Sequence, residues 1–291
     1  MLPTVSYIIA SYNEETYIES CLRSVIAQQY PSIEIVLVDD GSSDNTVSIA
    51  KMILSSQSKF KYKIFALENN FGKCNAYNKA YQNSTGLIIT LIGADDIAPT
   101  FRTLSAVKAM IGSNSPYVYG SYRTFEFLNG YQISKTTKLI SINPCFYNAV
   151  PGGTSFLSRT LADQIFPIPV SLPAEDWYMS YYAYMNNVTP YCINDCLLYY
   201  RIHDSNSTST KSCPAYLKAI KREIVVLSHL VSVPCPKSLN LLRLSIHFRR
   251  LIVSFMEYPS PMSFARAMIC LFSPLRARFL KAVFLVSSCR L

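Results

Sequence analysis

The sequence predicts an α/β protein with a mostly parallel sheet, and three features carry this prediction. Apolar, β-branched segments alternate with amphipathic segments up to about residue 92, at the spacing of βαβ units. Polar, mostly acidic residues follow three of the predicted strands, near Ala10, Asp39 and Asp96. Half of the 291 residues are hydrophobic and 15% are charged, which favours a large core and argues against disorder.

The first third of the chain supplies most of the predicted sheet. Strands are expected over residues 4–10, 33–38, 62–67 and 87–92, and amphipathic helices between them over residues 18–26, 44–56 and 74–81. The strand at 87–92 is almost entirely apolar, as expected of a strand buried on both faces. No G-x-G-x-x-G fingerprint and no Walker P-loop follows any of these strands. A dinucleotide site and ATP or GTP hydrolysis are therefore disfavoured.

The rest of the chain has a looser pattern. A helix is expected over residues 99–111, a hairpin over 117–139 with its turn at Asn129-Gly130, a helix from Glu175 and a strand over 196–202. The segment Pro151–Ser158 is expected to be a glycine-rich loop that enters a strand. Four proline-separated helices follow, over residues 217–231, 238–256, 262–272 and 275–286. We expect one domain over 1–212, divided near residue 97, and a helical tail over 213–291.

Two adjacent carboxylates, Asp95 and Asp96, follow the apolar strand at 87–92. The carboxyl ends of strands are where open α/β sheets bind their ligands. Adjacent like charges repel, and a divalent cation that carries a diphosphate would neutralise them. The alternative is that both acids belong to a solvated turn or a helix N-cap.

The net charge of +9 belongs to the tail. Of the 27 Lys and Arg residues 12 lie from Cys213 onward, against 2 of the 18 Asp and Glu residues, so the first 212 residues are nearly neutral. Basic side chains in the tail alternate with apolar ones: Arg243, His247, Arg249, Arg250, Arg266, Arg276, Arg278 and Lys281. Such segments can lie on an anionic membrane surface. The alternative is a bundle packed on the first domain, with solvated basic residues. The neutral first domain disfavours nucleic acid as a partner.

Cysteine usage and hydropathy indicate the compartment. The nine cysteines are scattered without a C-x-x-C pair, and the three histidines lack zinc-ligand spacing, so we expect reduced thiols and no zinc site. We expect no secretion signal. No apolar stretch of about 18 residues is free of charge, so we expect no membrane-spanning helix. These features together predict a cytoplasmic location.

Several motifs occur in an order that resembles the large family 2 of inverting glycosyltransferases. The most specific is Val38-Asp-Asp-Gly-Ser-Ser-Asp44, which is nearly identical to the signature of the family's second strand. The other matching stretches are Ile8-Ile-Ala-Ser-Tyr-Asn-Glu14, Asn70-Phe-Gly-Lys-Cys-Asn-Ala76, Gly93-Ala-Asp-Asp96, Glu175-Asp176 and Tyr200-Arg-Ile-His203. The resemblance covers about residues 3–207.

The resemblance implies a GT-A fold: a Rossmann-like, mostly parallel sheet, here with a helical C-terminal extension. It implies transfer of a sugar from a UDP- or dTDP-linked donor to a saccharide hydroxyl, with inversion of the anomeric centre and with Mg²⁺ or Mn²⁺ as cofactor. The expected role is cell-surface polysaccharide synthesis on a polyprenyl-diphosphate-linked acceptor. The protein would then be peripheral on the cytoplasmic face of the inner or plasma membrane.

The resemblance also implies roles for particular residues. The residues expected at the nucleotide sugar are Ala10, Tyr12, Glu14, Asp40, Lys73 and Asp95. The expected metal ligands are Asp96, Asp95 and His203. Asp176 is expected to be the catalytic base, with Glu175 as its neighbour. Simpler readings stay open. Tyr12 could have a packing role alone, and Lys73 could be a solvent-exposed residue in the first turn of a helix. The acidic pair could serve only to stabilise a helix N-terminus. His203 could be half buried and bonded to backbone.

Two positions depart from the family pattern. Ala10 stands where a proline is usual, and Gly93 stands where the first acid of the metal-binding D-x-D run is usual. The second departure leaves Asp95 and Asp96 to share the metal and ribose contacts. It also keeps open an alternative function, a non-catalytic nucleotide-sugar-binding protein with a degenerate metal motif.

Overall fold

The computed structural model describes residues 2–127, 131–137, 144–146, 148, 150–203, 212–232, 236–258, 260–272 and 274–288. Contacts between Cα atoms divide the chain into two compact units. The first unit contains Met1–Ser141 and Ala149–Ile202, and the second contains Ile142–Asn148 and His203–Leu291. The predicted hairpin turn at Asn129-Gly130 and the polar loop Asp204–Lys211 lie outside the described residues.

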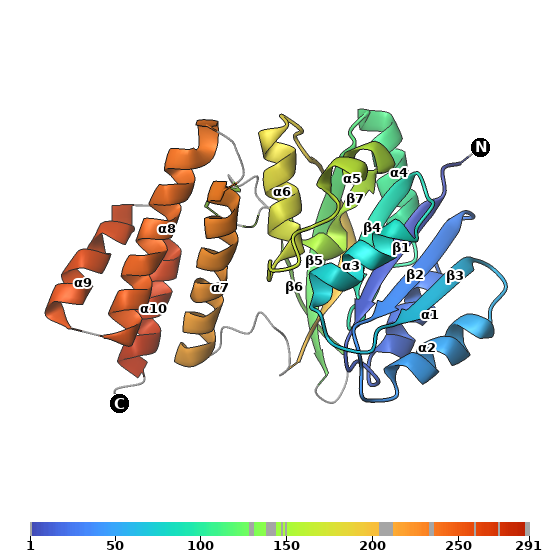
Figure 1. Ribbon diagram of the computed structural model, residues 1–291, viewed down its shortest axis with the longest axis horizontal. Helices are drawn as coiled ribbons and strands as arrows, with labels where there is room; N and C mark the ends of the chain where they lie inside the picture. The colour runs from blue at the N-terminus through green and yellow to red at the C-terminus, as the bar shows by residue number, and fades with distance from the viewer. Residues whose placement is uncertain are drawn as a thin grey trace. The chain divides into compact units, whose positions relative to one another are not determined.

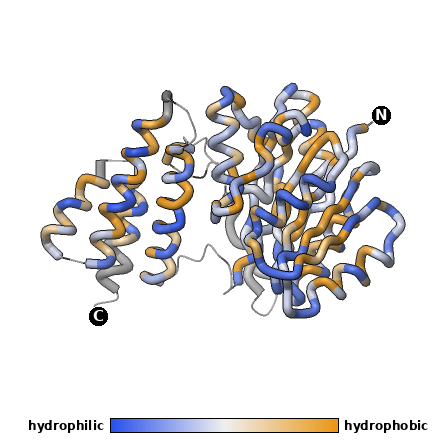
Figure 2. The backbone as a smooth tube through the Cα atoms, in the orientation of Figure 1, coloured by the Kyte–Doolittle hydropathy of each residue, from blue (hydrophilic) through white to orange (hydrophobic). Residues whose placement is uncertain are grey.

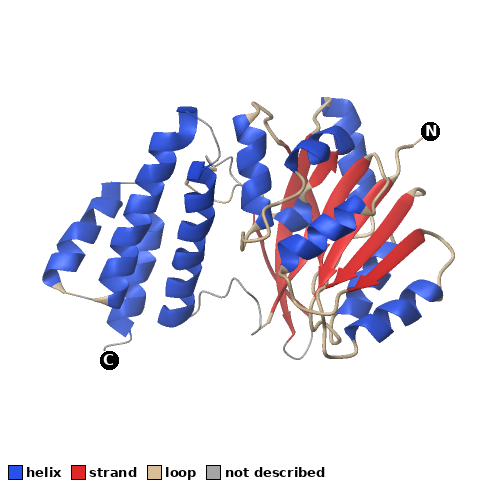
Figure 3. Ribbon diagram, viewed as in Figure 1, coloured by secondary structure: helices blue, strands red, loops and turns tan. Residues whose placement is uncertain are grey.

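The first unit is built on one eight-stranded sheet with the order β3-β2-β1-β4-β7-β5-β6, and β8 pairs with β5. The strands are β1 Val5–Ser11, β2 Ile33–Asp39, β3 Lys61–Ala66, β4 Ile88–Gly93, β5 Tyr117–Phe127, β6 Tyr131–Thr137, β7 Phe156–Ser158 and β8 Tyr191–Ile202. β1 runs parallel to both β2 and β4, and β2 runs parallel to β3. The predicted α/β class with a mostly parallel sheet is confirmed (Figure 3).

Helices cover both faces of this sheet. They are α1 Ile18–Ile26, α2 Thr46–Ser55, α3 Lys73–Gln82, α4 Arg102–Ser113, α5 Arg159–Ile165 and α6 Glu175–Met185, with a 3₁₀ turn at Gly152–Thr154. α1, α2 and α4 bury apolar side chains in one cluster with alternate residues of β1 and β2, such as Ile9 and Ile35. α3 contacts β1 and β2 from the other face (Figure 1). Figure 2 shows hydrophobic residues concentrated along the central strands.

The burial of each strand follows its place in the sheet. Every residue of β2 is buried, which agrees with its apolar sequence and its central position. β3 lies at the edge, and its residues Lys61, Tyr62 and Lys63 are exposed. Charged side chains on an edge strand hinder pairing with another chain. The loops that follow the central strands therefore start from the buried part of the sheet.

The second unit is helical and has a core of its own. Its elements are α7 Cys213–Ser232, α8 Pro236–Glu257, α9 Pro261–Ala267, a 3₁₀ segment Met268–Phe272 and α10 Arg276–Ser288. Tyr216, Ile252 and Phe279 from three of these helices share one buried apolar cluster. None of the helices among the described residues is both long enough and apolar enough to cross a membrane.

Candidate active site

The carboxyl ends of β1, β2 and β4 lie at one edge of the sheet. Ser11 pairs with Asp39 across β1 and β2, and Ala10 pairs with Gly93 across β1 and β4. The polar loops that follow these three strands therefore start side by side. The sequence predicted the polar loops, and the parallel pairing of β1 with β2 and β4 brings them to one edge.

Two acids at the end of β2 hold the neighbouring loops. The carboxylate of Asp39 accepts hydrogen bonds from the Ser11 hydroxyl at 2.9 Å and from the Ser42 backbone N–H at 2.8 Å. The carboxylate of Asp40 accepts from the backbone N–H groups of Phe71 at 2.9 Å and Gly72 at 2.8 Å. Asp40 therefore fixes the loop that leads into α3, a structural contact that the sequence did not indicate.

A close approach of two loops explains the glycine that follows Asp40. Gly41 has φ +80°, and a Cβ there would lie 2.7 Å from the backbone carbon of Asn69. A side chain at position 41 would be strained by both the backbone conformation and the collision. The β2–α2 loop and the β3–α3 loop are thus built as one rim of the site.

The loop after β1 places a second group of predicted ligands on this rim. Ala10 is half buried in β1, and the Tyr12 side chain is 46% exposed. Asn13 accepts a hydrogen bond from the Ser43 backbone N–H at 2.9 Å, which ties this loop to the β2–α2 loop. Burial, together with the charge of Asp95, raises the pKa of Glu14 to about 8. Glu14 is therefore within electrostatic reach of Asp95, a residue of the β4 loop.

The carboxylates of Asp95 and Asp96 converge beside Gly93. A Cβ at Gly93 would lie 2.5 Å from Asp95 Oδ1 and 3.2 Å from Asp96 Oδ2. Burial raises the pKa of Asp96 well above its usual range, and the charge of Asp95 adds to this effect. The missing side chain at position 93 is thus the space that both carboxylates occupy. The glycine that replaces the first acid of the D-x-D run therefore leaves room for the carboxylates of Asp95 and Asp96.

Arg201 of β8 holds this acidic turn in place. Its backbone N–H donates to Asp96 Oδ1 at 3.0 Å, and its Nε donates to the Asp95 carbonyl at 2.7 Å. The guanidinium lies 4.7 Å from the ring centroid of Tyr17 and 4.6 Å from that of Phe125. Arg201 had no predicted role, although it lies inside the Tyr200–His203 match, whose position in the motif could have identified it.

Arg102 is a second buried cation near the acidic turn. Its Nη2 donates to the Thr90 hydroxyl at 2.7 Å and to the Leu91 carbonyl at 2.9 Å. The charges of Arg102 and Arg201 both act to lower the pKa of Asp96, against the larger effect of burial. No local sequence pattern indicated this role, because Arg102 lies in the first turn of a helix.

The predicted catalytic pair begins α6. Glu175 Oε2 lies 2.6 Å from Lys73 Nζ, and the Glu175 side chain is 7% exposed. Asp176 Oδ1 accepts from the Trp177 backbone N–H at 2.8 Å, while Oδ2 lies 3.5 Å from the Gly152 nitrogen. The predicted glycine-rich loop therefore packs on the acidic pair. A Cβ at Gly152 would lie 3.2 Å from Asp176 Cβ.

Tyr77 of α3 connects the two acidic groups. Burial raises the pKa of Tyr77 well above its usual range, and the charges of Glu175, Asp95 and Asp96 raise it further, in that order. One buried phenol therefore experiences the field of both the β4 acids and an acid of α6. Of these acids, Glu175 contacts α3 directly through its ion pair with Lys73, the first residue of that helix.

The carboxylates of the β4 loop could hold a divalent cation. Mg²⁺ and similar ions commonly bind one or two carboxylates and complete their shell with phosphate oxygens and water. The crowding of Asp95 and Asp96 beside Gly93 fits such an ion. No group of three or more His, Cys, Asp or Glu side chains that could hold a metal occurs among the described residues. His203, the third predicted ligand, belongs to the second unit.

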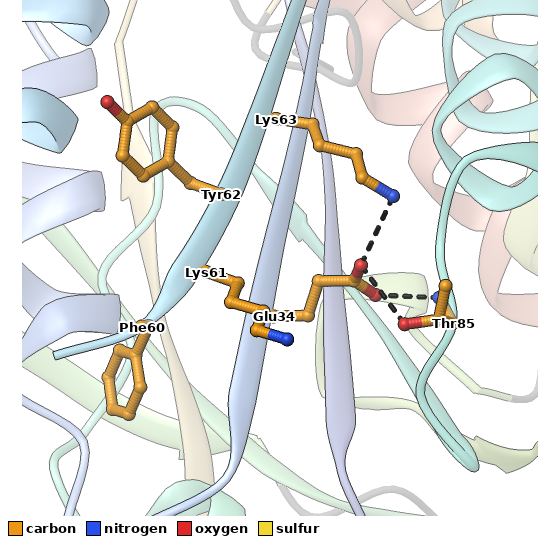
Figure 4. Close-up of a pocket in the computed structure, with 6 residues that line it drawn as sticks. All are labelled: Glu34, Phe60, Lys61, Tyr62, Lys63 and Thr85. Atoms are coloured by element: carbon orange, nitrogen blue, oxygen red, sulfur yellow. Dashed lines mark hydrogen bonds and ion pairs between the residues drawn. The ribbon is translucent and has the colours of Figure 1, made fainter. Parts of the chain in front are cut away.

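A separate pocket of about 470 Å³ lies beside β3 (Figure 4). Its lining residues Glu34 and Lys61 are near the amino ends of β2 and β3, whereas the predicted site residues follow the carboxyl ends. Glu34 accepts from the Thr85 backbone N–H at 2.7 Å and lies 3.5 Å from Lys63 Nζ. These contacts join β2, β3 and the start of β4, and the pocket is not part of the candidate site.

Comparison with known proteins gave one family match and several relatives. A family model described as glycosyl transferase family 2 matches residues 6–163. The chain is 29% identical over 248 residues to UDP-Glc:alpha-D-GlcNAc-diphosphoundecaprenol beta-1,3-glucosyltransferase WfgD of Escherichia coli, covering 82% of this chain and 90% of that protein. It is 31% identical over 136 residues to poly-beta-1,6-N-acetyl-D-glucosamine synthase of Staphylococcus epidermidis, covering 42% of this chain and 32% of the synthase.

Two of the solved structures that resemble the chain are glycosyltransferase-fold proteins with a bound nucleotide sugar. The mannosyltransferase PcManGT from Pyrobaculum calidifontis, in complex with GDP-Man and Mn²⁺, has a TM-score of 0.66 at 18% identity, covering 100% of this chain and 87% of that one. S. aureus TarS 1–349 in complex with UDP-GlcNAc has a TM-score of 0.64 at 19% identity, covering 96% of this chain and 81% of that one. At such identities the likeness shows the fold alone.

Proposed function

The chain belongs to glycosyl transferase family 2 and has the GT-A fold, and from this premise we propose how it works. As a glycosyltransferase of polysaccharide synthesis, it would transfer a sugar from a nucleotide diphosphate to a saccharide hydroxyl with inversion of the anomeric centre. The observation that carries the proposal is that Asp95 and Asp96 crowd together after β4, while the Lys73–Glu175 ion pair ties the start of α6 to the loop that Asp40 holds at the end of β2. Acids from two sides of one site can serve the leaving group and the acceptor separately.

The donor would bind on the rim formed by the loops after β1, β2 and β3. Tyr12 is exposed there and can stack on the nucleotide base. Asp40 can accept a hydrogen bond from the base. The backbone near Ala10 and the Glu14 side chain would line the same rim. Lys73 can approach a phosphate by leaving its ion pair with Glu175, because its side chain is 44% exposed. Asp95 would contact the ribose or share the metal.

Asp96 and Asp95 would hold Mg²⁺ or Mn²⁺. When bound, such an ion offsets charge on the departing diphosphate as a Lewis acid. The protein's own contribution is to fix the two carboxylates, since Arg201 bonds to both residues of the pair. The mannosyltransferase with a similar fold is described in complex with Mn²⁺, which supports the assignment.

Asp176 would be the general base. An inverting displacement needs a base on the face of the sugar opposite the leaving group, to take the proton of the acceptor hydroxyl. Asp176 lies beside Glu175, whose ion pair with Lys73 at the start of α3 supports this placement. Glu175 would orient the acceptor side and hold Lys73 until the donor arrives.

The acceptor would be a lipid-linked saccharide such as a polyprenyl-diphosphate sugar. The E. coli relative, which matches over 82% of this chain, is named for a diphosphoundecaprenol-linked acceptor. The basic second unit would keep the protein peripheral on the cytoplasmic face of the inner or plasma membrane. The alternative is a nucleotide-sugar-binding protein without turnover, for which the glycine at position 93 is the motivating observation.

A donor screen tests the proposal. Thermal shift with Mn²⁺ across UDP-, dTDP- and GDP-sugars should identify one donor that stabilises the protein only with the metal. Incubation of that donor with a polyprenyl-diphosphate saccharide should give a product whose anomeric configuration, read by NMR, is opposite to that of the donor. Binding without any transfer would favour the alternative, and a product of retained configuration would contradict the proposed mechanism.

A further inference from the structure

A basic groove lies between α7 and α8 in the second unit. Its volume is about 320 Å³, and six residues line it: Ser228 and Val231 of α7 and Arg243, Ile246, His247 and Arg250 of α8. The three basic residues are exposed, and their spacing along α8 places them on one face of that helix. Ile246 is 8% exposed and forms an apolar floor.

The charge of this groove is not neutralised within the described part of the chain. The second unit has two described acids, and both are engaged elsewhere: Glu223 pairs with Arg249 and Arg278, and Glu257 pairs with Lys221. Among the described residues, neither Arg243 nor Arg250 forms an ion pair or hydrogen bond. Two guanidinium groups and an imidazole therefore line one groove, with no acidic partner among the residues that the structure describes.

Two other arginines of this unit, Arg249 and Arg278, differ from those of the groove because both pair with Glu223. Arg249 follows Phe248 on the same helix, is fully buried, and donates from Nε to Glu223 at 2.7 Å. The sequence pattern grouped Arg249 and Arg278 with the lipid-facing residues. In the structure Arg249 is in the core and the half-buried Arg278 pairs with Glu223, which leaves Arg243 and Arg250 as the pair that can bind an external anion.

We propose that this groove binds the phosphate of an anionic lipid headgroup at a membrane surface. Guanidinium groups match phosphate oxygens in geometry and charge. The two helices that form the groove also carry exposed apolar side chains, since Val225 of α7 is 51% and Leu244 of α8 is 42% exposed. A soluble phosphate would gain nothing from them, whereas a lipid surface would. The inference rests on the proposed membrane role and names the residues that carry it.

Vesicle sedimentation of the full-length chain tests the assignment. Binding to phosphatidylcholine vesicles that contain phosphatidylglycerol is compared with binding to phosphatidylcholine alone. The double variant Arg243→Gln/Arg250→Gln should lose about 30-fold in partitioning to the anionic vesicles, the fold-change for about 1 kcal/mol per basic residue near the lipid. Arg243→Lys/Arg250→Lys keeps the charge but loses the guanidinium fork, so it should lose part of the binding, though less than the glutamine variant.

The matched control removes the same charge elsewhere in the unit. Arg266 and Arg276 are exposed and do not line the groove, so Arg266→Gln/Arg276→Gln should lose less than about 3-fold. Equal losses in the two double variants would replace a headgroup site with diffuse attraction, and no loss in the groove variant would refute the proposal outright. Ser228→Glu, which places an acid in the groove, is a second variant should the first not fold, and it should lower binding similarly.

Titration with inorganic diphosphate distinguishes the source of the phosphate. Heat of binding that disappears in Arg243→Gln/Arg250→Gln, without any preference for anionic vesicles, would assign the groove to a soluble anion and overturn the lipid assignment. Thermal shift by the donor sugar is measured in parallel. Failure of vesicle binding with intact donor binding would refute only this inference, whereas loss of donor binding in the unmodified protein would refute the proposed function.

Discussion

At the scale of single residues, burial changes the ionisation of the acids around β4. The pKa of Glu14 is raised to about 8 by burial and by Asp95, and that of Asp96 is raised by the same two causes. A bound cation would favour the charged forms of these carboxyls. The metal-free protein should therefore carry protons in this site at pH values where exposed acids are ionised.

Glu14 gives this expectation a measurable form. Its folded pKa of about 8 lies above its usual value of 4.5, so between these values the folded state holds a proton that the unfolded state has lost. Stability from this group is present below pH 4.5 and is lost as the pH rises toward 8. In metal-free buffer, the Tm of the wild type should fall across this window relative to that of Glu14→Gln. Parallel Tm profiles for the two proteins would contradict the pKa assignment.

Gly93 is the residue where the sequence departs most clearly from the family. Since a Cβ there would meet the end of the Asp95 side chain at 2.5 Å, Gly93→Ala should rotate that carboxylate without disturbing the backbone. We expect a change of less than about 1 kcal/mol in the free energy of unfolding. Mn²⁺-dependent donor affinity should fall by about tenfold, as measured by titration calorimetry. Gly112→Ala is the control, because a Cβ at Gly112 meets nothing within 4 Å. Equal donor affinity in both variants would show that the crowding has no role.

At the scale of elements, β8 is the strand that completes the acidic turn. Arg201 reaches from β8 to the β4 loop and donates from Nη2 to the Ser20 hydroxyl of α1 at 3.0 Å. Three elements distant in sequence thus share one side chain. A strand that only closed the sheet would not need a buried arginine at this position.

The variant Arg201→Lys separates charge from geometry. Lysine keeps the positive charge but loses the fork that bonds both Asp95 and Ser20, so buried acceptors are left unpaired. The free energy of unfolding should fall by about 2 to 3 kcal/mol, measured by urea denaturation. Arg123→Lys, an exposed change on β5, should cost less than about 0.5 kcal/mol. Similar costs for the two variants would mean that the Arg201 bonds do not stabilise the fold.

The sequence predicted helices and strands well where apolar residues form a continuous run or a regular period. β1, β2 and β4 follow mostly apolar runs, and the helices between them follow periodic ones. α5 was not predicted, since Arg159–Ile165 is too short to show a period. β8 begins at Tyr191 rather than at Cys196, because its first residues are mostly exposed and lack a buried pattern. Pairing with β5 decides their conformation, and pairing is not local.

Non-local contacts also limit how much of the site can be predicted from the sequence. Acids that follow apolar strands were recognisable, because strand ends of a parallel sheet converge. The contacts of Arg201 join residues more than 100 positions apart, and those of Lys73 with Glu175 join two helix starts. Such partners are fixed by tertiary packing. The roles of the predicted ligands and of Asp176 in donor binding and transfer remain predictions.

At the scale of the whole molecule, each of the two units is compact in its own contacts. The first unit carries every predicted site residue except His203, and the second carries the excess positive charge. We infer a division of labour in which one unit performs the transfer and the other binds the surface that presents the acceptor. Variants in one unit should then leave the readout of the other unchanged.

The central claim is that Asp95 and Asp96 hold the donor with its metal while Asp176 activates the acceptor. Titration calorimetry of the preferred nucleotide sugar with Mn²⁺, run beside a transfer assay, tests it in Asp96→Asn and Asp176→Asn. Asp96→Asn should lose both donor binding and transfer. Asp176→Asn should bind the donor within about threefold of the wild type and transfer at least about 100-fold more slowly. Near-normal transfer by Asp176→Asn, or unchanged donor affinity in Asp96→Asn, would contradict the account.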